Sequence, residues 1–168
     1  MSFQMPQAPE KGRYVQAMFD AIATNYDRVN DLMTAGAHRL WKRQVVALSE
    51  LAPGGKALDL ATGTGDIAFL LADRAGARGE VVGLDFSEGM LAIARERDLE
   101  GRPITWVQGD MTALDLPDAS FDAVTVGYGL RNVTDLSKAL SEIHRVLRPG
   151  GRAVSLDLGK PRLKLVRW

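Results

Sequence analysis

The fold is decided by the stretch Lys56-Ala57-Leu58-Asp59-Leu60-Ala61-Thr62-Gly63-Thr64-Gly65-Asp66, a short apolar run that ends in small residues and two glycines. The residues that follow, 67–72, place apolar side chains at helical spacing. Strand, glycine turn and helix in this order are typical of an α/β sheet that opens a nucleotide-sized pocket at the carboxyl end of its first strand. Glycine suits such a turn because a ligand must approach the backbone closely, or because φ is positive.

Downstream of this stretch the sequence alternates regularly between strands and helices. Apolar runs predict further strands over 80–85, 104–107, 121–127 and 152–158. Ser87 is the expected N-cap of the helix after the second strand. Thr134 or Asp135 is expected to start the last helix, which Arg148-Pro149-Gly150-Gly151 ends. Strands separated by such helices indicate βαβ units, so the predicted fold class is α/β with a parallel sheet and helices on both faces.

The residues before the glycine stretch divide into two parts. Residues 1–12 are polar and contain proline, which predicts a flexible tail. Residues 13–52 carry two amphipathic helical patterns, the second from about His38 to Leu51, and are interpreted as a helical cap. This cap covers either a sheet edge or the pocket itself, and the sequence leaves both readings open. Residues 53–168 form the predicted ligand-binding domain.

Composition limits the classes of function. The chain has 168 residues, enough for one domain with a real core, and its formal net charge is zero. Without a long basic run, nucleic acid is a poor partner. The absence of cysteine excludes disulfides and thiolate metal sites, and no metal is expected. No apolar run reaches membrane-spanning length, so we expect a soluble, cytoplasmic protein without a transmembrane segment.

Two ligands compete for the glycine loop. The residues 63–68 fit the dinucleotide pattern G-x-G-x-x-G/A, and Asp85 follows at the spacing of a ribose-binding carboxylate. This match alone is compatible with an NAD(P)-dependent oxidoreductase. However, Asp66 lies at the helix start, where a pyrophosphate would bind, and Asp59 lies just upstream. Two acids there favour a cationic ligand without phosphate, and S-adenosylmethionine (AdoMet) is such a ligand. Helix capping is the alternative role for Asp66.

Acidic residues recur at the next strand ends. Asp85 suits the ribose diol, and Asp110 suits the adenine exocyclic amine, with the Met111 backbone N–H donating to a ring nitrogen. Phe86 and Met111 would supply apolar flanks to the adenine. Each acid taken alone is more often a cap or turn residue, but acids at successive strand ends favour a pocket.

Several motifs are more specific than the glycine loop. They are Phe19-Asp20-x-Ile22-Ala23-x-x-Tyr26-Asp27-x-x-Asn30, His38-Arg39-Leu40-Trp41-Lys42, Gly127-Tyr128-Gly129-Leu130-Arg131-Asn132-Val133 and Leu147-Arg148-Pro149-Gly150-Gly151. In this order they resemble the ubiquinone/menaquinone biosynthesis C-methyltransferases, over about residues 13–161. The resemblance implies a class I, Rossmann-like AdoMet-dependent methyltransferase. It would methylate a ring carbon of a polyprenylated quinol, most often converting demethylmenaquinol to menaquinol.

The resemblance also carries AdoMet contacts over by position. Together with the loop, the expected cofactor-binding residues are Asp59, Thr62, Gly63, Thr64, Gly65, Asp85, Phe86, Asp110, Met111 and Gly127. Relatives often have serine where this chain has Gly127, which keeps only a backbone contact. Ala61 stands where the wider methyltransferase motif has its first glycine, so the turn must tolerate a methyl group.

The chemistry needs a base and a group that stabilises a phenolate oxygen. Arg131 is the candidate for phenolate stabilisation, with Asn132 or Tyr128 as orienting donors. His38 is a candidate base on the cap. Pairing with a neighbouring carboxylate is the structural alternative for Arg131.

Family chains continue beyond the fifth strand with a helix and two more strands, so the resemblance implies a sheet truncated near Trp168. The implied partner is a lipophilic quinol met at the membrane surface, which would place the protein at the inner face of the membrane. A homo-oligomer is compatible with the sequence. A methyltransferase of another small molecule, an NAD(P) oxidoreductase and a non-enzymatic binding module stay open as alternatives.

Overall fold

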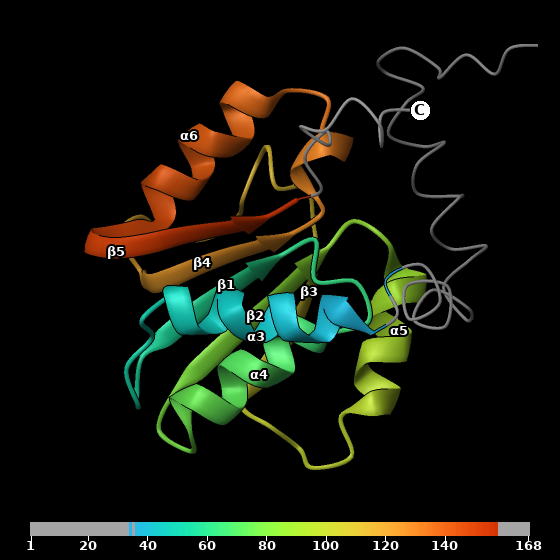
Figure 1. The fold of residues 1–168 in the computed structure, drawn as a ribbon. Helices are drawn as coiled ribbons and strands as arrows, with labels where there is room; N and C mark the ends of the chain where they lie inside the picture. The colour runs from blue at the N-terminus through green and yellow to red at the C-terminus, as the bar shows by residue number, and fades with distance from the viewer. Residues whose placement is uncertain (1–33, 35, 158–168) are drawn as a thin grey trace, which may run out of the picture.

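The computed structural model of the chain describes Thr34 and residues 36–157. Its centre is a five-stranded sheet in the order β3-β2-β1-β4-β5, and every pair of neighbours is parallel (Figure 1). The strands are β1 (Lys56–Leu60), β2 (Glu80–Asp85), β3 (Ile104–Gln108), β4 (Phe121–Gly127) and β5 (Leu147–Leu156). The helices are α3 (Ala37–Leu48), α4 (Asp66–Ala75), α5 (Glu88–Arg97) and α6 (Leu136–Val146), with a short 3₁₀ turn, η2 (Leu130–Asn132).

Helices cover both faces of the sheet, as the alternating pattern predicts. Figure 1 shows α3 and α4 on one face and α6 on the opposite face. Two apolar cores match this arrangement: one joins α3 and α4 to β1 and β2, and the other joins α6 to β1 and β4. The central strand β1 contributes to both cores, with Ala57 in the first and Leu58 and Leu60 in the second. Its carboxyl end, and the glycine loop after it, are therefore fixed from two sides.

The predicted strands agree closely with the observed ones, except at the last. β2 and β4 have the predicted bounds, and β3 extends one residue further, to Gln108. The fifth strand was expected from Arg152, but β5 already pairs at Leu147, opposite Phe121. Its register then shifts, so that Arg152 lies opposite Ala123. α6 ends at Val146, before the Pro-Gly-Gly segment that was predicted to end it, and this segment is accommodated as an irregularity within β5, with Gly150 at a φ of 83°.

The helix starts follow the local sequence. Ser87 caps α5, because its hydroxyl oxygen accepts from the backbone N–H of Met90 at 3.1 Å. Asp135, rather than Thr134, caps α6 by accepting from the N–H of Lys138 at 3.0 Å. Both caps direct the chain from a strand end on the pocket side into the next helix.

Part of the expected organisation lies outside the described residues. This applies to the tail 1–12, the first cap helix in 13–33, and the chain after residue 157. The second cap helix is α3, three residues shorter at its C-terminus than predicted. Among the helices of the described part, none is both long and apolar enough to cross a membrane.

Candidate functional site

A cavity opens at the carboxyl ends of β1, β2, β3 and β4. Parallel strands all point toward this edge, so the residues that follow them converge on one space. Six of the expected cofactor-binding residues line the cavity, namely Gly63, Asp85, Phe86, Asp110, Met111 and Gly127. The structure therefore brings together the ribose, adenine and glycine-loop candidates.

Asp85 ends β2 and links it to the glycine loop. Its Oδ2 accepts from the backbone N–H of Gly63 at 2.7 Å, and its Oδ1 accepts from the N–H of Ser87 at 2.9 Å. A carboxylate can accept about four hydrogen bonds, so these two are compatible with accepting from ribose hydroxyls as well. Asp85 thus holds the loop and faces the cavity at the same time.

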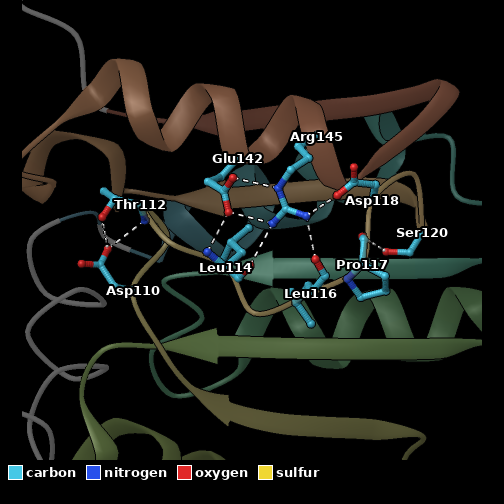
Figure 2. Close-up of polar contacts among 9 residues, drawn as sticks. All are labelled: Asp110, Thr112, Leu114, Leu116, Pro117, Asp118, Ser120, Glu142 and Arg145. Carbon is cyan, nitrogen blue, oxygen red and sulfur yellow. Dashed lines mark hydrogen bonds and ion pairs between the residues drawn. The ribbon is translucent and has the colours of Figure 1, made fainter.

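Asp110 follows β3 in a tight turn. Its Oδ1 accepts from both the backbone N–H and the hydroxyl of Thr112, each at 2.8 Å. Figure 2 shows this oxygen directed to Thr112 and the second carboxylate oxygen pointing away from it. The turn fixes the side chain in one orientation beside Met111, which also lines the cavity.

Two non-glycine residues with positive φ flank the cavity at adjacent strand ends. Ala61 follows β1 with a φ of 51°, and Tyr128 follows β4 with a φ of 60°. Gly129 lies against Ala61 so closely that an added Cβ would come within 2.5 Å of the Ala61 methyl group. The Ala61 methyl group that the turn must tolerate is therefore accommodated by Gly129, which follows the neighbouring strand β4. Such left-handed residues cost free energy and concentrate at functional sites.

Asp59 and Thr62 lie beside the cavity lining rather than in it. Asp59 is 1% exposed, and its carboxylate accepts from the hydroxyls of Thr62 and Thr125, each at 2.6 Å. Burial raises the pKa of Asp59 to about 6, although both hydroxyls act to lower it. These contacts give Asp59 and Thr62 a role in shaping the turn between β1 and the glycine loop.

Asp66 is engaged by two cations and does not line the cavity. It accepts from Lys42 Nζ on α3 at 2.7 Å and from Arg97 Nη2 on α5 at 2.7 Å. Burial opposes ionisation, but Lys42 and Arg97 together hold the pKa of Asp66 below its usual value. Arg97 also donates to the backbone carbonyl of Thr64 at 2.8 Å. Since its charge is compensated, Asp66 does not supply the phosphate repulsion that the sequence suggested.

The two glycines of the loop have different roles. Gly63 lines the cavity at a φ of 58°, and no described atom lies within 4 Å of the position its Cβ would take. Gly65 has a φ of 91°, and its Cβ would come within 2.8 Å of Trp106 and 3.0 Å of Phe69. Gly63 therefore leaves space on the cavity side, whereas Gly65 admits the indole ring of Trp106 on the other side of the loop.

The four catalytic candidates are separated. Tyr128 and Asn132 line the cavity. Arg131 lies over the Tyr128 ring, and its Nε is 3.2 Å from the Tyr128 carbonyl oxygen and 3.3 Å from Asp157 Oδ1. The expected structural alternative, a carboxylate partner, is thus observed for Arg131. His38 is buried in α3, with Nδ1 2.8 Å from the Thr34 hydroxyl, and is not among the residues that line the cavity.

Several residues that line the cavity were not predicted for it, and four of them lie beside predicted residues, namely Ser87, Gly109, Gly129 and Thr134. Each directly follows or adjoins a residue already placed at a strand end or in the Gly-Leu-Arg-Asn-Val segment. Extending each strand-end candidate by one or two residues would have found them. No comparable signal pointed to Lys42 or Arg97, because their partner Asp66 is distant in sequence.

The chain resembles known proteins over most of its length. The ubiE/COQ5 methyltransferase family matches residues 7–168. The chain belongs to this family. It is 49% identical, over 88% of its length and 66% of the relative's, to a 2-phytyl-1,4-naphtoquinone methyltransferase of Thermosynechococcus vestitus. It is 43% identical, over 99% of its length and 67% of the relative's, to a demethylmenaquinone methyltransferase of Symbiobacterium thermophilum.

The fold agrees with the family. A SAM-dependent methyltransferase from Aquifex aeolicus matches with a TM-score of 0.66 and 24% identity, over 73% of this chain and 66% of that one. The resemblance to the quinone-biosynthesis methyltransferases and the class I, Rossmann-like fold are thus confirmed, and the family is a methyltransferase family. The chain spans about two thirds of the length of the curated relatives it matches.

The residues around the cavity fit AdoMet. Asp85 and Asp110 supply carboxylate acceptors, Phe86 and Met111 supply apolar surface, and the glycine loop leaves Gly63 without a side chain. The chain therefore places carboxylate acceptors in the cavity at the ends of the adjacent strands β2 and β3.

Proposed function

We propose that this chain uses AdoMet to methylate a ring carbon of a polyprenylated quinol, with demethylmenaquinol as the substrate and menaquinol as the product. The observation that carries the proposal is the single cavity that Asp85 and Asp110 line together with Tyr128 and Asn132. The named relatives support the substrate class, because a phytyl naphthoquinone and demethylmenaquinone share a naphthoquinone ring with an isoprenoid-type tail.

The positions of the cavity residues support the proposed cofactor-binding roles. Asp85 would accept from the ribose hydroxyls, and Asp110 from the adenine amine, while the Met111 backbone N–H would donate to the ring. Bound AdoMet supplies a methyl group activated by a sulfonium. Asp59 and Thr62 hold the turn that leads to Gly63. Thr64 and Gly65 continue the loop from Gly63 into α4.

Catalysis asks the protein mainly for alignment in a dry site, which can contribute roughly 7–11 kcal/mol. The quinol carbon becomes nucleophilic when a ring hydroxyl loses its proton. Arg131, an exposed residue between the cavity-lining Tyr128 and Asn132, would stabilise the resulting phenolate oxygen. Asn132 and Tyr128 line the cavity and would orient the ring. His38 keeps the role of a candidate base only if the quinol reaches the cap.

The substrate also implies a location. A polyprenylated quinol resides in a membrane, so the proposed enzyme would meet it at the membrane surface from the cytoplasmic side. Homo-oligomerisation is part of the same proposal and is tested by the mass of the protein in solution.

The test incubates the full chain with AdoMet and a short-tailed demethylmenaquinol under reducing conditions. Mass spectrometry of the extracted quinones should show the gain of one methyl group, dependent on both protein and AdoMet. Calorimetry with AdoMet and with NAD on the same preparation distinguishes the alternatives. Binding of NAD in preference to AdoMet would overturn the proposal, and AdoMet binding without turnover would indicate a binding module.

A second experiment identifies the substrate from the quinones of cells. Cells that lack the gene should accumulate the demethylated quinone, and the gene with Asp85→Ala should fail to restore the methylated form. If the quinone pool of such cells is unchanged, the substrate is another small molecule.

A further inference from the structure

Arg145 of α6 makes a hydrogen bond with each of its five N–H donors. Its Nε donates to Glu142 Oε1 at 2.8 Å, and Nη2 donates to Glu142 Oε2 at 2.7 Å and to the Leu114 carbonyl at 2.8 Å. Its Nη1 donates to the Leu116 carbonyl at 2.7 Å and to Asp118 Oδ1 at 2.6 Å. Figure 2 shows the guanidinium placed between Glu142, Asp118 and these two carbonyls.

Glu142 completes the contact from the same helix. Its Oε2 accepts from the backbone N–H of Leu114 at 2.8 Å, so Leu114 is held by its N–H and its carbonyl together. The Arg145 side chain lowers the pKa of Glu142 to about 2, which keeps this carboxylate ionised. The helix backbone adds a bond, from Ala119 N to the Arg145 carbonyl at 2.9 Å. The segment from Leu114 to Ala119, which we call the clamped segment, is thus attached to α6.

The clamped segment begins directly after the turn that carries Asp110. The N–H of Ala113 donates to the Asp110 carbonyl at 3.0 Å, and Thr112 binds the Asp110 side chain. Met111 and Leu114 belong to the same apolar core. No flexible linker separates Asp110 and Met111 from Leu114, so a shift of the clamped segment would move both cavity residues.

We propose that Arg145 and Glu142 are positioning residues that set the adenine side of the AdoMet site. The inference rests on the proposed function, because it assumes that Asp110 and the Met111 backbone N–H make hydrogen bonds to the adenine of AdoMet. A carboxylate acceptor and an N–H donor match the amine and ring nitrogen of adenine. Hypoxanthine presents a carbonyl and a ring N–H at the same positions, so it mismatches both groups. Discrimination between the two bases therefore reports the position of this turn.

The experiment measures the affinities of the full chain for S-adenosylhomocysteine and S-inosylhomocysteine by calorimetry. We expect the wild-type protein to prefer the adenosyl compound. Arg145→Lys, which retains the charge but cannot make the five bonds, should lower this preference about tenfold, as expected for one to two weakened hydrogen bonds. Glu142→Gln should lower it in the same direction, and the double variant should add little to either change.

Arg102→Lys is the matched control. Like Arg145, Arg102 pairs with more than one carboxylate, but its partners Asp73, Asp98 and Glu100 lie outside the clamped segment. Its replacement should leave the preference for the adenosyl compound unchanged, whatever its effect on stability.

The outcomes are distinct. If Arg145→Lys and Glu142→Gln weaken both compounds equally, or weaken neither, the positioning role is overturned and the cluster only stabilises the fold. If Arg145→Lys does not fold, Glu142→Gln decides, because its amide oxygen still accepts from Leu114. If the wild-type protein binds neither compound, the proposed function itself fails.

Discussion

The Asp66 carboxylate lies 2.7 Å from Lys42 Nζ, which joins the first residue of α4 to the cap helix α3. The side chains are only 11% (Lys42) and 23% (Asp66) exposed, and Arg97 binds the second oxygen of Asp66 from α5. The helices α3 and α5 therefore both contact the N-terminus of α4, the helix that follows the glycine loop. The charge that was expected to select the ligand instead holds the loop between its neighbours.

We expect Asp66→Asn to destabilise the protein by about 2 kcal/mol, because it leaves two partly buried cations without their anion. The measurement is the free energy of unfolding by urea at neutral pH. Glu80→Gln is the matched control, since Glu80 pairs with Lys56 at the same 2.7 Å but its side chain is 68% exposed. The control should change stability little, because solvent screens such a pair. Equal effects of the two variants would contradict the importance of burial here.

The sequence predicted the fold well because its evidence was local. The strand bounds of β2 and β4 follow from short apolar runs, and the cap at Ser87 follows from one side chain. Partners distant in the chain were not predictable in this way. Lys42 and Asp66 are 24 residues apart in the sequence. No local sequence pattern around either residue indicates that the two side chains pair.

In the candidate site, too, the sequence predicted some features and not others. Asp59 and Asp85 both belong to strands that lead to the cavity, and the sequence gives them equal weight. In the structure Asp85 lines the cavity, whereas Asp59 is enclosed by Thr62 and Thr125. Which side of a buried strand holds the ligand depends on the packing of its neighbours, and the alternation of a fully buried strand does not report it.

We expect Asp59 to make stability depend on pH between about 4 and 6. Burial raises its pKa from 3.8 to about 6, so the folded state binds this proton more tightly than the unfolded state does. The contribution of Asp59 to stability is therefore greatest below pH 3.8 and is lost as the pH rises through 6. Asp59→Asn removes the effect, so the stability difference, variant minus wild type, should increase by about 2 kcal/mol between pH 4 and pH 7.

Urea unfolding of both proteins across this range provides the measurement. The ionisation of Glu142, whose pKa is lowered from 4.5 to about 2, acts in the opposite direction at pH values below about 4.5, and it cancels in the difference. A difference that stays constant from pH 4 to pH 7 would show that Asp59 titrates normally.

We expect Arg131→Ala to abolish methyl transfer while AdoMet affinity, measured by calorimetry, stays near the wild-type value. Arg131 contacts Tyr128 and Asp157 and is not among the residues that line the cavity, so its loss should spare the cofactor. Arg131→Lys should retain part of the activity, because it keeps a cation near the developing phenolate. Asp157→Asn is the control, because it removes the carboxylate partner of Arg131 but keeps the Arg131 cation. It should therefore affect methyl transfer less than Arg131→Ala does. A large loss of AdoMet affinity in Arg131→Ala would place this residue in the cofactor site instead.

The two glycines of the loop should respond differently to alanine. Gly63→Ala should cost about 1 kcal/mol of stability from its positive φ and should weaken AdoMet binding about tenfold or more, because the new methyl group enters the cavity lining. Gly65→Ala should cost about 3 kcal/mol, because the methyl group also meets Trp106 and Phe69. Adding Trp106→Leu to Gly65→Ala should then recover part of that loss. Thermal unfolding and AdoMet calorimetry on all three variants separate the two effects, and a Gly63→Ala protein that binds AdoMet normally would remove Gly63 from the ligand contact.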